Sequence, residues 1–182
     1  MRLLEMVKTV QIPESVSIKI DGRVITVEGE KGRLIRDFSH APITFQKMEK
    51  TVEIRTEWPR KKEAAVVGTV SSHIRNMIIG VTKGFTYKLK IVFSHFPISV
   101  KIEGKNVVVE NFTGERGRRL TKIVGETQVI VRPEDVIVQG KNLEEVSQTA
   151  ANIEQATKVK LKDPRVFLDG IYIYERLEGM ET

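Results

Sequence analysis

KIDGRVITVEGEKG (residues 19–32) is repeated in altered form as KIEGKNVVVENFTGERG (residues 101–117). In both stretches an isoleucine and an acid precede a glycine, a valine-rich segment follows, and a Gly-x-x-Gly motif closes the pattern. Ile12-Pro13 and Phe96-Pro97 correspond as well, at an overall offset of about 80 to 86 residues. Solenoid repeats have shorter periods of about 20 to 50 residues, whereas this offset is the size of a small domain. The sequence therefore predicts a duplicated domain.

The duplication divides the 182 residues into two small domains and a short tail. We place the domains at residues 1–84 and 85–176. Residues 177–182 are acidic and lack a pattern, so a frayed tail is expected there. Domains of this size bury small cores, and each is expected to depend on its twin or on a partner for stability.

Each half shows the period-two alternation of half-buried strands. In the first half, residues 16–20 and 24–28 flank Asp21-Gly22, a dipeptide that suits a tight hairpin turn. In the second half, residues 98–102 and 107–109 flank a similar turn. Further strands are predicted at residues 34–38, 44–46 and 52–55 of the first half and at 120–124, 129–131 and 136–138 of the second.

One amphipathic helix is predicted to close each half. Pro59 suits the opening turn of the first helix, and Gly84 suits its C-terminal cap. Asn142, with Glu145 three residues later, predicts a capping box for the second. Apolar residues spaced three or four apart give each helix a face to bury against a sheet. These residues are Val67, Val70, Ile74, Met77 and Val81, and then Leu143, Val146, Ala150 and Ile153.

Two further segments complete the predicted architecture. Residues 85–93 alternate almost strictly and predict a strand that leads into the second half. Residues 166–168 and 171–173 flank Asp169-Gly170 and predict a terminal hairpin. The predicted fold class is α+β, with two tandem copies of a small, mainly antiparallel sheet that each pack with one helix.

The composition excludes several classes of protein. The chain has no cysteine, so a disulfide framework, a thiolate metal site and a cysteine nucleophile are all excluded. The N-terminus lacks the apolar core of a signal peptide, and no apolar run approaches the roughly 18 residues of a membrane span. We expect a soluble cytoplasmic protein with no membrane partner.

The charge indicates a nucleic-acid partner. Lys and Arg number 30 against 24 Asp and Glu, a net charge of +6, and the pI is about 9.5. Residues 1–84 carry a net charge of +5 and residues 85–182 a net charge of +1. The second half nevertheless gathers its cations in two segments and its acids elsewhere, which predicts sides of opposite sign. The two basic segments contain Arg116, Arg118, Arg119 and Lys122, and Lys158, Lys160, Lys162 and Arg165.

Catalytic chemistry finds little support in the sequence. His40, His73 and His95 lack the short spacing of metal ligands and have no paired carboxylates nearby. Ser71-Ser72-His73 contains a nucleophile and a base, but adjacent helical residues point in different directions. A hydrolase centred on His73 is therefore the weakest function considered. No enzymatic activity, cofactor, metal ion or small-molecule substrate is expected.

The two Gly-x-x-Gly motifs, residues 29–32 and 114–117, are similar to the loop with which KH domains clamp a nucleic-acid backbone. That loop joins two helices, whereas here strands are predicted on both sides, which favours flexible β connections. Arg116, Arg118 and Arg119 still make the second loop suitable for phosphate contacts. Because most aromatic residues are assigned to the core, we expect folded RNA to be recognised through its backbone and shape.

Three features together resemble the ribosomal protein L6 family of the large subunit. They are the tandem sheet-and-helix units, GFTYKL at residues 84–89, and KDPRVFLDGIY at residues 162–172. The resemblance covers almost the whole chain. Bacterial members usually carry a glycine- and lysine-rich stretch after the Lys-Asp-Pro motif. This chain lacks that stretch, so the resemblance is to the archaeal or eukaryotic type.

The resemblance implies a structural constituent of the large ribosomal subunit without enzymatic activity. It implies two kinds of partner: 23S-type rRNA, bound mainly by the second domain, and neighbouring ribosomal proteins. The expected location is near the base of the lateral stalk and the region where translation factors act. Carried over to this chain, the RNA-binding residues are the eight cations of the two basic segments.

Arg60, Lys61 and Lys62 are secondary candidates in the first domain, which has the larger net charge. Local clusters take precedence over the net charge because a phosphate senses charges within about 8 Å at physiological salt. The alternative function is a protein-interaction module whose sheets bind other proteins and whose basic residues serve only to keep it solvated. A gel shift with structured RNA distinguishes the two.

Overall fold

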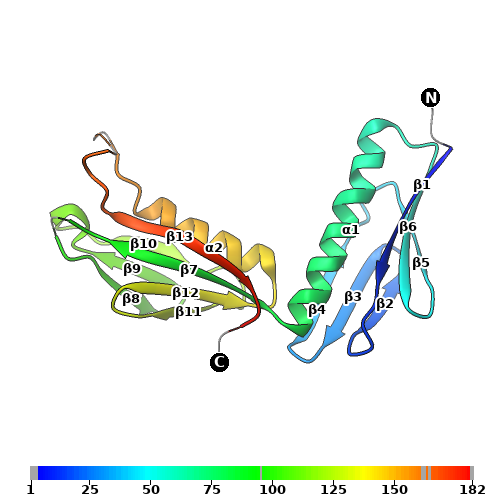
Figure 1. Cartoon of the computed structure of the whole chain (residues 1–182), viewed down its shortest axis with the longest axis horizontal. Coiled ribbons are helices and arrows are strands. Elements are labelled where there is room, and N and C mark those ends of the chain that lie inside the picture. Colours follow the sequence, from blue (N-terminus) through cyan, green and yellow to red (C-terminus); the bar gives the residue numbers. More distant parts are fainter. Residues whose placement is uncertain (1–3, 95, 161–162, 164, 181–182) are drawn as a thin grey trace. The chain divides into compact units, whose positions relative to one another are not determined.

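The computed structural model describes residues 4–94, 96–160, 163 and 165–180. The chain divides into two compact units, residues 1–83 and 84–182, one residue before the predicted boundary. Each unit contains two small antiparallel sheets and one α-helix (Figure 1). This confirms the predicted duplicated α+β class, with the strands of each copy shared between two sheets.

In the first unit the sheets have the strand orders β1-β6-β5 and β2-β3-β4, and α1 packs against β1, β3, β4 and β6. The elements are β1 (Glu5–Gln11), β2 (Ser17–Asp21), β3 (Val24–Gly29), β4 (Gly32–Asp37), β5 (Thr44–Lys47), β6 (Thr51–Glu57) and α1 (Lys61–Thr82).

The core of the first unit lies between α1 and the two sheets. Val67, Ile74 and Val81 of the predicted apolar face of α1 are fully buried. They meet strand residues such as Ile25 and Ile54, which are also inaccessible to solvent. Each such burial contributes roughly 1.5–3 kcal/mol, so the apolar face holds the helix on the sheets.

In the second unit the sheets have the strand orders β11-β12-β7-β13 and β10-β9-β8, and α2 packs against β7, β10, β12 and β13. The elements are β7 (Phe85–Val92), β8 (Ser99–Glu103), β9 (Asn106–Glu110), the 3-10 turn η1 (Phe112–Gly114), β10 (Arg119–Lys122), β11 (Gln128–Val131), β12 (Asp135–Gly140), α2 (Leu143–Ala156) and β13 (Gly170–Glu178).

The paired hairpins of the repeat are built alike. Asp21 lies opposite Val24 in the β2–β3 register, and Glu103 lies opposite Asn106 in the β8–β9 register. The intervening turns start at Gly22 and Gly104, whose φ angles are +58° and +61°. Side chains with a Cβ rarely adopt this conformation, so glycine at these positions sets both turns.

The helix ends agree with the predictions except at Pro59 and Glu145. Gly84, at φ +78°, follows α1 as predicted, but α1 begins at Lys61, so Pro59 precedes the helix and does not lie in its opening turn. The side-chain oxygen of Asn142 caps α2 by accepting from the backbone N–H of Glu144 at 3.1 Å. The predicted capping box is wrong, however, because the Glu145 carboxylate accepts from the backbone N–H of Glu126 at 3.1 Å instead.

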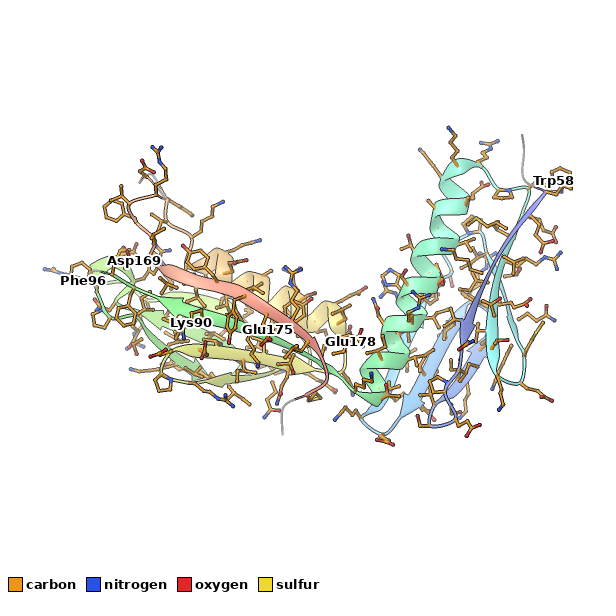
Figure 2. The ribbon with its side chains drawn as sticks, in the orientation of Figure 1. Trp58, Lys90, Phe96, Asp169, Glu175 and Glu178 are labelled. Carbon is orange, nitrogen blue, oxygen red and sulfur yellow. The ribbon has the colours of Figure 1, made fainter. Side chains whose placement is uncertain are left out.

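The predicted terminal hairpin is wrong. Residues 166–168 form no strand: the backbone N–H groups of Val166 and Phe167 donate to the carbonyl of Asp163. Asp169 is fully buried and accepts from the backbone N–H of Ser94 at 2.7 Å, at the start of β13 (Figure 2). Asp169-Gly170 is thus the entry into a strand rather than a turn.

The predicted frayed tail begins too early. β13 extends to Glu178 and pairs antiparallel with β7 along its length. The Gly179 N–H then donates to the carbonyl of Gly84 at 2.8 Å, and the Gly179 carbonyl accepts from the Thr86 hydroxyl at 2.6 Å. Ladder hydrogen bonds hold residues 177–179 although their sequence lacks an apolar pattern. Residues 181–182 lie outside the described residues.

Candidate nucleic-acid interface

The two basic segments of the second unit meet beside the C-terminal end of α2. The first precedes and forms β10, and the second follows Ala156, the last residue of α2. Arg119 connects them, because its guanidinium donates to the carbonyls of Ala156 at 2.8 Å and Lys158 at 3.4 Å. A cation at the last carbonyls of a helix also complements the helix dipole.

Arg119 uses its donors inside the protein. Its guanidinium binds both carboxylate oxygens of Glu115, at 2.9 and 2.5 Å, and lies 4.1 Å from the centre of the Phe112 ring. The side chain is only 23% exposed. Arg119 was predicted to contact phosphate directly; in this geometry it holds the loop, β10 and the end of α2 together. The cation–π contact and the forked ion pair both favour arginine over lysine here.

A hollow of about 390 Å³ lies on this face. It is lined by Arg119, Leu120, Gln155, Ala156 and Lys160. Leu120 is 64% exposed in the middle of β10, so the floor of the hollow presents an apolar surface among cations. Sequence reasoning placed Leu120 in a strand but could not show which face it occupies.

Four of the predicted cations are exposed on the two basic segments, and one of them, Lys160, lines the hollow. They are Arg116, Lys122, Lys158 and Lys160. None of them forms an ion pair with any other residue that the structure describes. Their charges are therefore available to an anionic partner, and together with the open edge of β10 they form what we call the β10–α2 face.

Arg118 faces a different set of groups. Its guanidinium lies 3.0 Å from a Glu110 oxygen and 3.7 Å from a Glu103 oxygen, although the side chain is 62% exposed. Lys101 contacts Glu110 as well, at 2.9 Å. The hydrogen bond from Lys101, and then the charges of Lys101 and Arg118, lower the pKa of Glu110. Because carboxylates already neutralise Arg118, it contributes less free charge than Arg116.

The last predicted residues of this set lie beyond Lys160. Arg165 forms a forked pair with Asp163, with an Nη2–Oδ2 distance of 2.8 Å, and the hydrogen bonds from Arg165 lower the pKa of Asp163. Lys162 lies outside the described residues. The secondary candidates Arg60, Lys61 and Lys62 belong to the first unit, at the start of α1.

The aromatic residues of the second unit are more exposed than predicted. Phe85 is buried and Tyr87 is half-buried, in line with a core role. Phe93, Tyr172 and Tyr174 are exposed by 43% or more, so the assignment of most aromatic residues to the core is wrong for these three. β13 is an edge strand. Along it the exposed Tyr172 and Tyr174 alternate with the buried Ile171 and the half-buried Ile173.

The hydrolase hypothesis gains nothing from the geometry around His73. The Ser72 hydroxyl donates to the carbonyl of Gly68 within α1 at 3.1 Å, and Ser71 is buried. His73 instead lies 3.4 Å from the Arg36 guanidinium and packs against the Phe38 ring. In the described parts of the chain no three His, Asp or Glu side chains are grouped as metal ligands would be. No described helix is long and apolar enough to cross a membrane.

Comparison with known proteins identifies relatives along nearly the whole chain. The family model of Ribosomal protein L6 matches residues 12–84 and 96–170, one match in each unit. Large ribosomal subunit protein uL6 of Desulfurococcus amylolyticus is 50% identical over 182 residues, covering 98% of this chain and 99% of that protein. The proteins of the same name from Aeropyrum pernix and Methanosarcina mazei are 50% and 48% identical, and cover 95% and 94% of this chain and 96% and 98% of their own lengths. All three organisms are archaea, as the resemblance implied.

Proposed function

Because the chain belongs to the ribosomal protein L6 family, which is a structural family of the large ribosomal subunit and not an enzyme family, we propose that its second unit binds large-subunit rRNA through the β10–α2 face. The protein is then a non-catalytic scaffold, with rRNA and neighbouring ribosomal proteins as its partners. We further propose a position near the base of the lateral stalk and the region where translation factors act, as the family resemblance implies.

The observation that carries this proposal is the meeting of two basic segments that lie far apart in the sequence. Arg116 and Lys122 approach from one segment, and Lys158 and Lys160 from the other, while Arg119 joins the two. A double-stranded RNA helix presents its phosphates in rows across a shallow minor groove and is recognised mainly by shape. Cations from two segments that meet at one face suit such rows better than a single linear cluster does.

The four free cations fit the electrostatics of phosphate binding. Lysine acts as a flexible point charge, while an unpaired arginine offers a planar fork to phosphate oxygens. Each phosphate contact releases condensed counterions, so binding weakens as salt rises. Arg118, which carboxylates already pair, is expected to contribute less than Arg116.

The test is a gel shift of the full chain with a 23S-type rRNA transcript across a series of salt concentrations. The double variant Lys158→Ala/Lys160→Ala should weaken binding at low salt and reduce the slope of log K against log salt by about one per lysine. Lys19→Ala/Lys31→Ala removes the same charge from exposed positions of the first unit and serves as the matched control. If both variants lost the same affinity for rRNA, binding would depend on the net charge of the chain and not on the β10–α2 face.

The rival function, a protein-interaction module, makes the opposite prediction. In that case the chain would fail to shift structured RNA at low salt, and neither double variant would differ from the parent chain. Cross-linking of the assembled subunit tests the proposed location separately. Cross-links from residues 116 and 160 should reach rRNA of the factor-binding region, and cross-links confined to another part of the subunit would reject that location.

A further inference from the structure

The first unit carries an exposed aromatic residue in an unusual conformation. Trp58 is the only tryptophan of the chain and is 63% exposed. Its φ of +49° lies in the left-handed region, which bulky residues with a Cβ rarely adopt. The Trp58 N–H donates to the Leu4 carbonyl at 2.9 Å, while the next residue, Pro59, is buried. The backbone is thus held on both sides while the indole projects into solvent (Figure 2).

Three cations follow this indole directly. Arg60, Lys61 and Lys62 are all exposed and occupy the cap and first turn of α1. The Arg60 backbone N–H donates to Glu63 at 2.7 Å, but none of the three cationic side chains forms an ion pair with a residue of the described chain. A planar aromatic group therefore lies next to three free positive charges.

The equivalent place in the second unit shows that the fold itself does not require this arrangement. There α2 begins with the Asn142 cap, followed by Glu144 and Glu145 in its first turn. Acidic residues at a helix N-terminus complement the helix dipole, and cations oppose it. The start of α1 has a net positive charge at the same point of the repeat, with Glu63 as the acid of its first turn. Its cations and its strained tryptophan are both unfavourable for the isolated unit, which suggests a role in binding a ligand.

We propose that Trp58 and the cations of residues 60–62 bind an unpaired nucleotide of RNA. The base stacks on the exposed indole, and the phosphates on either side of it contact Arg60, Lys61 and Lys62. Base stacking on an aromatic side chain beside a basic strip is the mode by which proteins hold single-stranded nucleic acid without reading its sequence. The site lies in the first unit and shares no residue with the β10–α2 face. This inference rests on the proposed function and extends it: the second unit binds paired RNA, and the first unit binds a flexible or bulged nucleotide.

The chemistry favours RNA over an acidic protein segment. Among the described residues, Leu4 is the exposed apolar neighbour that bonds to Trp58, and two side chains offer a protein little surface. A binding hot spot normally lies within a larger, well-packed patch. A nucleobase needs only one flat face, and its backbone supplies a negative charge on each side. Protein binding is therefore kept as an outcome of the test.

The experiment uses the fluorescence of the full chain, which reports on this site alone because Trp58 is the only tryptophan. A ten-nucleotide oligoadenylate should quench Trp58 fluorescence at low salt, while a fully paired RNA duplex with the same number of phosphates should quench it little. The variant Lys61→Glu/Lys62→Glu should weaken the oligoadenylate affinity about tenfold or more. The control Lys19→Glu/Lys31→Glu, with the same change of charge in the same unit, should weaken it much less.

A second set of variants separates stacking from charge and this site from the β10–α2 face. Trp58→Ala, measured by a labelled oligoadenylate, should lose about tenfold in affinity or more, and Trp58→Phe should recover part of that loss. Lys158→Ala/Lys160→Ala should leave the quenching unchanged, so this proposal and the proposed function can fail separately. Circular dichroism and the midpoint of thermal unfolding establish that each variant is folded.

Three results would overturn the proposal. The first is the absence of quenching by oligoadenylate at low salt. The second is equal quenching by the paired duplex, which would mean that no unpaired base is needed. The third is quenching by an acidic aromatic peptide that the oligoadenylate does not compete away, which would assign the site to a protein partner.

Discussion

The two units share one repeated arrangement of strands and a helix, and they differ in the segments that the second unit adds to it. In the first, β3 and β4 are joined directly through Glu30-Lys31, and Gly29 pairs with Gly32 across the turn. In the second, residues 111–118 form a longer connection between β9 and β10, with the turn η1 inside it. This connection carries Arg116 and supplies Phe112 and Glu115 to Arg119. The candidate interface thus combines an insertion, which carries Arg116, with the repeated strand β10, which carries Lys122.

The second difference is a fourth strand. β7 pairs with β12 on one side and with β13 on the other, whereas its counterpart β1 pairs only with β6 among the described strands. The chain reaches β13 through the basic segment after α2. The segment that connects α2 to β13 therefore also carries Lys158 and Lys160 of the interface. In the second unit, additions to the repeat produce a larger sheet and a charged surface together.

The largest expected effect comes from loosening this added strand. Ile171 is fully buried in β13 and lies opposite Ile91 of β7. Ile171→Ala should destabilise the second unit by about 2–5 kcal/mol, because it removes buried methyl groups and leaves a cavity. Denaturation in urea followed by circular dichroism should show an earlier transition for the second unit. Trp58 fluorescence, which reports on the first unit, should keep its midpoint.

Tyr174→Ala is the matched control for that experiment. Tyr174 lies in the same strand, is 55% exposed, and coincides with the shift in the β7–β13 register. Its replacement should change the stability of the second unit far less. If Tyr174→Ala and Ile171→Ala were equally mild, β13 would be an attachment to the second unit rather than part of its core.

The next effect distinguishes the two Gly-x-x-Gly motifs. A Cβ on Gly29 would lie 2.8 Å from both the carbonyl oxygen and a methyl group of Val81 in α1. Gly29→Ala should therefore destabilise the first unit by about 1–3 kcal/mol through overpacking, seen as an earlier midpoint of Trp58 fluorescence in urea. Gly117→Ala, at the last position of the second motif, meets no atom within 4 Å and should be nearly neutral. Gly114, the first position of that motif, is constrained by a φ of +78° and by the Phe96 ring, so a large effect of Gly117→Ala would contradict the packing described for the second motif.

The strands show which parts of the fold can be predicted from the sequence and which cannot. The alternation of residues 16–28 and 98–109 predicted the hairpins correctly, because period-two burial and glycine turns are local features. β1 was not predicted, since its pairing with β6 lies some 50 residues away along the chain. Asp169-Gly170 was misread as a turn because the partner of the buried carboxylate, Ser94, belongs to a distant segment.

The candidate interface was foreseen in its composition but not in its geometry. Charge clustering identified Arg116, Lys122, Lys158 and Lys160, which are exposed on two segments that Arg119 joins. It could not distinguish Arg119 from the other arginines, because the role of Arg119 depends on four residues that the fold brings together. They are Phe112, Glu115, Ala156 and Lys158. Counting charges treats all arginines alike, whereas hydrogen bonds decide which of them remain free.

The role of Arg119 gives the third prediction. Arg119→Ala removes the pair with Glu115, the bonds to the end of α2 and the contact with Phe112, and should destabilise the second unit by about 1–2 kcal/mol. Arg116→Ala is the matched control from the same connection. It should lower the affinity for rRNA without shifting the unfolding midpoint. Arg119→Ala should shift the midpoint, and an unchanged midpoint would return Arg119 to the set of phosphate contacts.

The smallest effect concerns the carboxylates that correspond in the two repeats, Glu110 and Glu28. Lys101, and then Arg118, lower the pKa of Glu110, so its ion pairs stabilise the folded second unit above about pH 4.5. That contribution is lost as the pH falls through the lowered pKa, because protonation then breaks the pairs. Glu110→Gln should therefore reduce the difference between the unfolding midpoints at pH 7 and pH 3. Among the described residues Glu28 forms one ion pair, with Arg33 at 3.6 Å, so Glu28→Gln should change that difference less. If the two variants changed that difference equally, the two cations beside Glu110 would stabilise the second unit no more than Arg33 beside Glu28 stabilises the first.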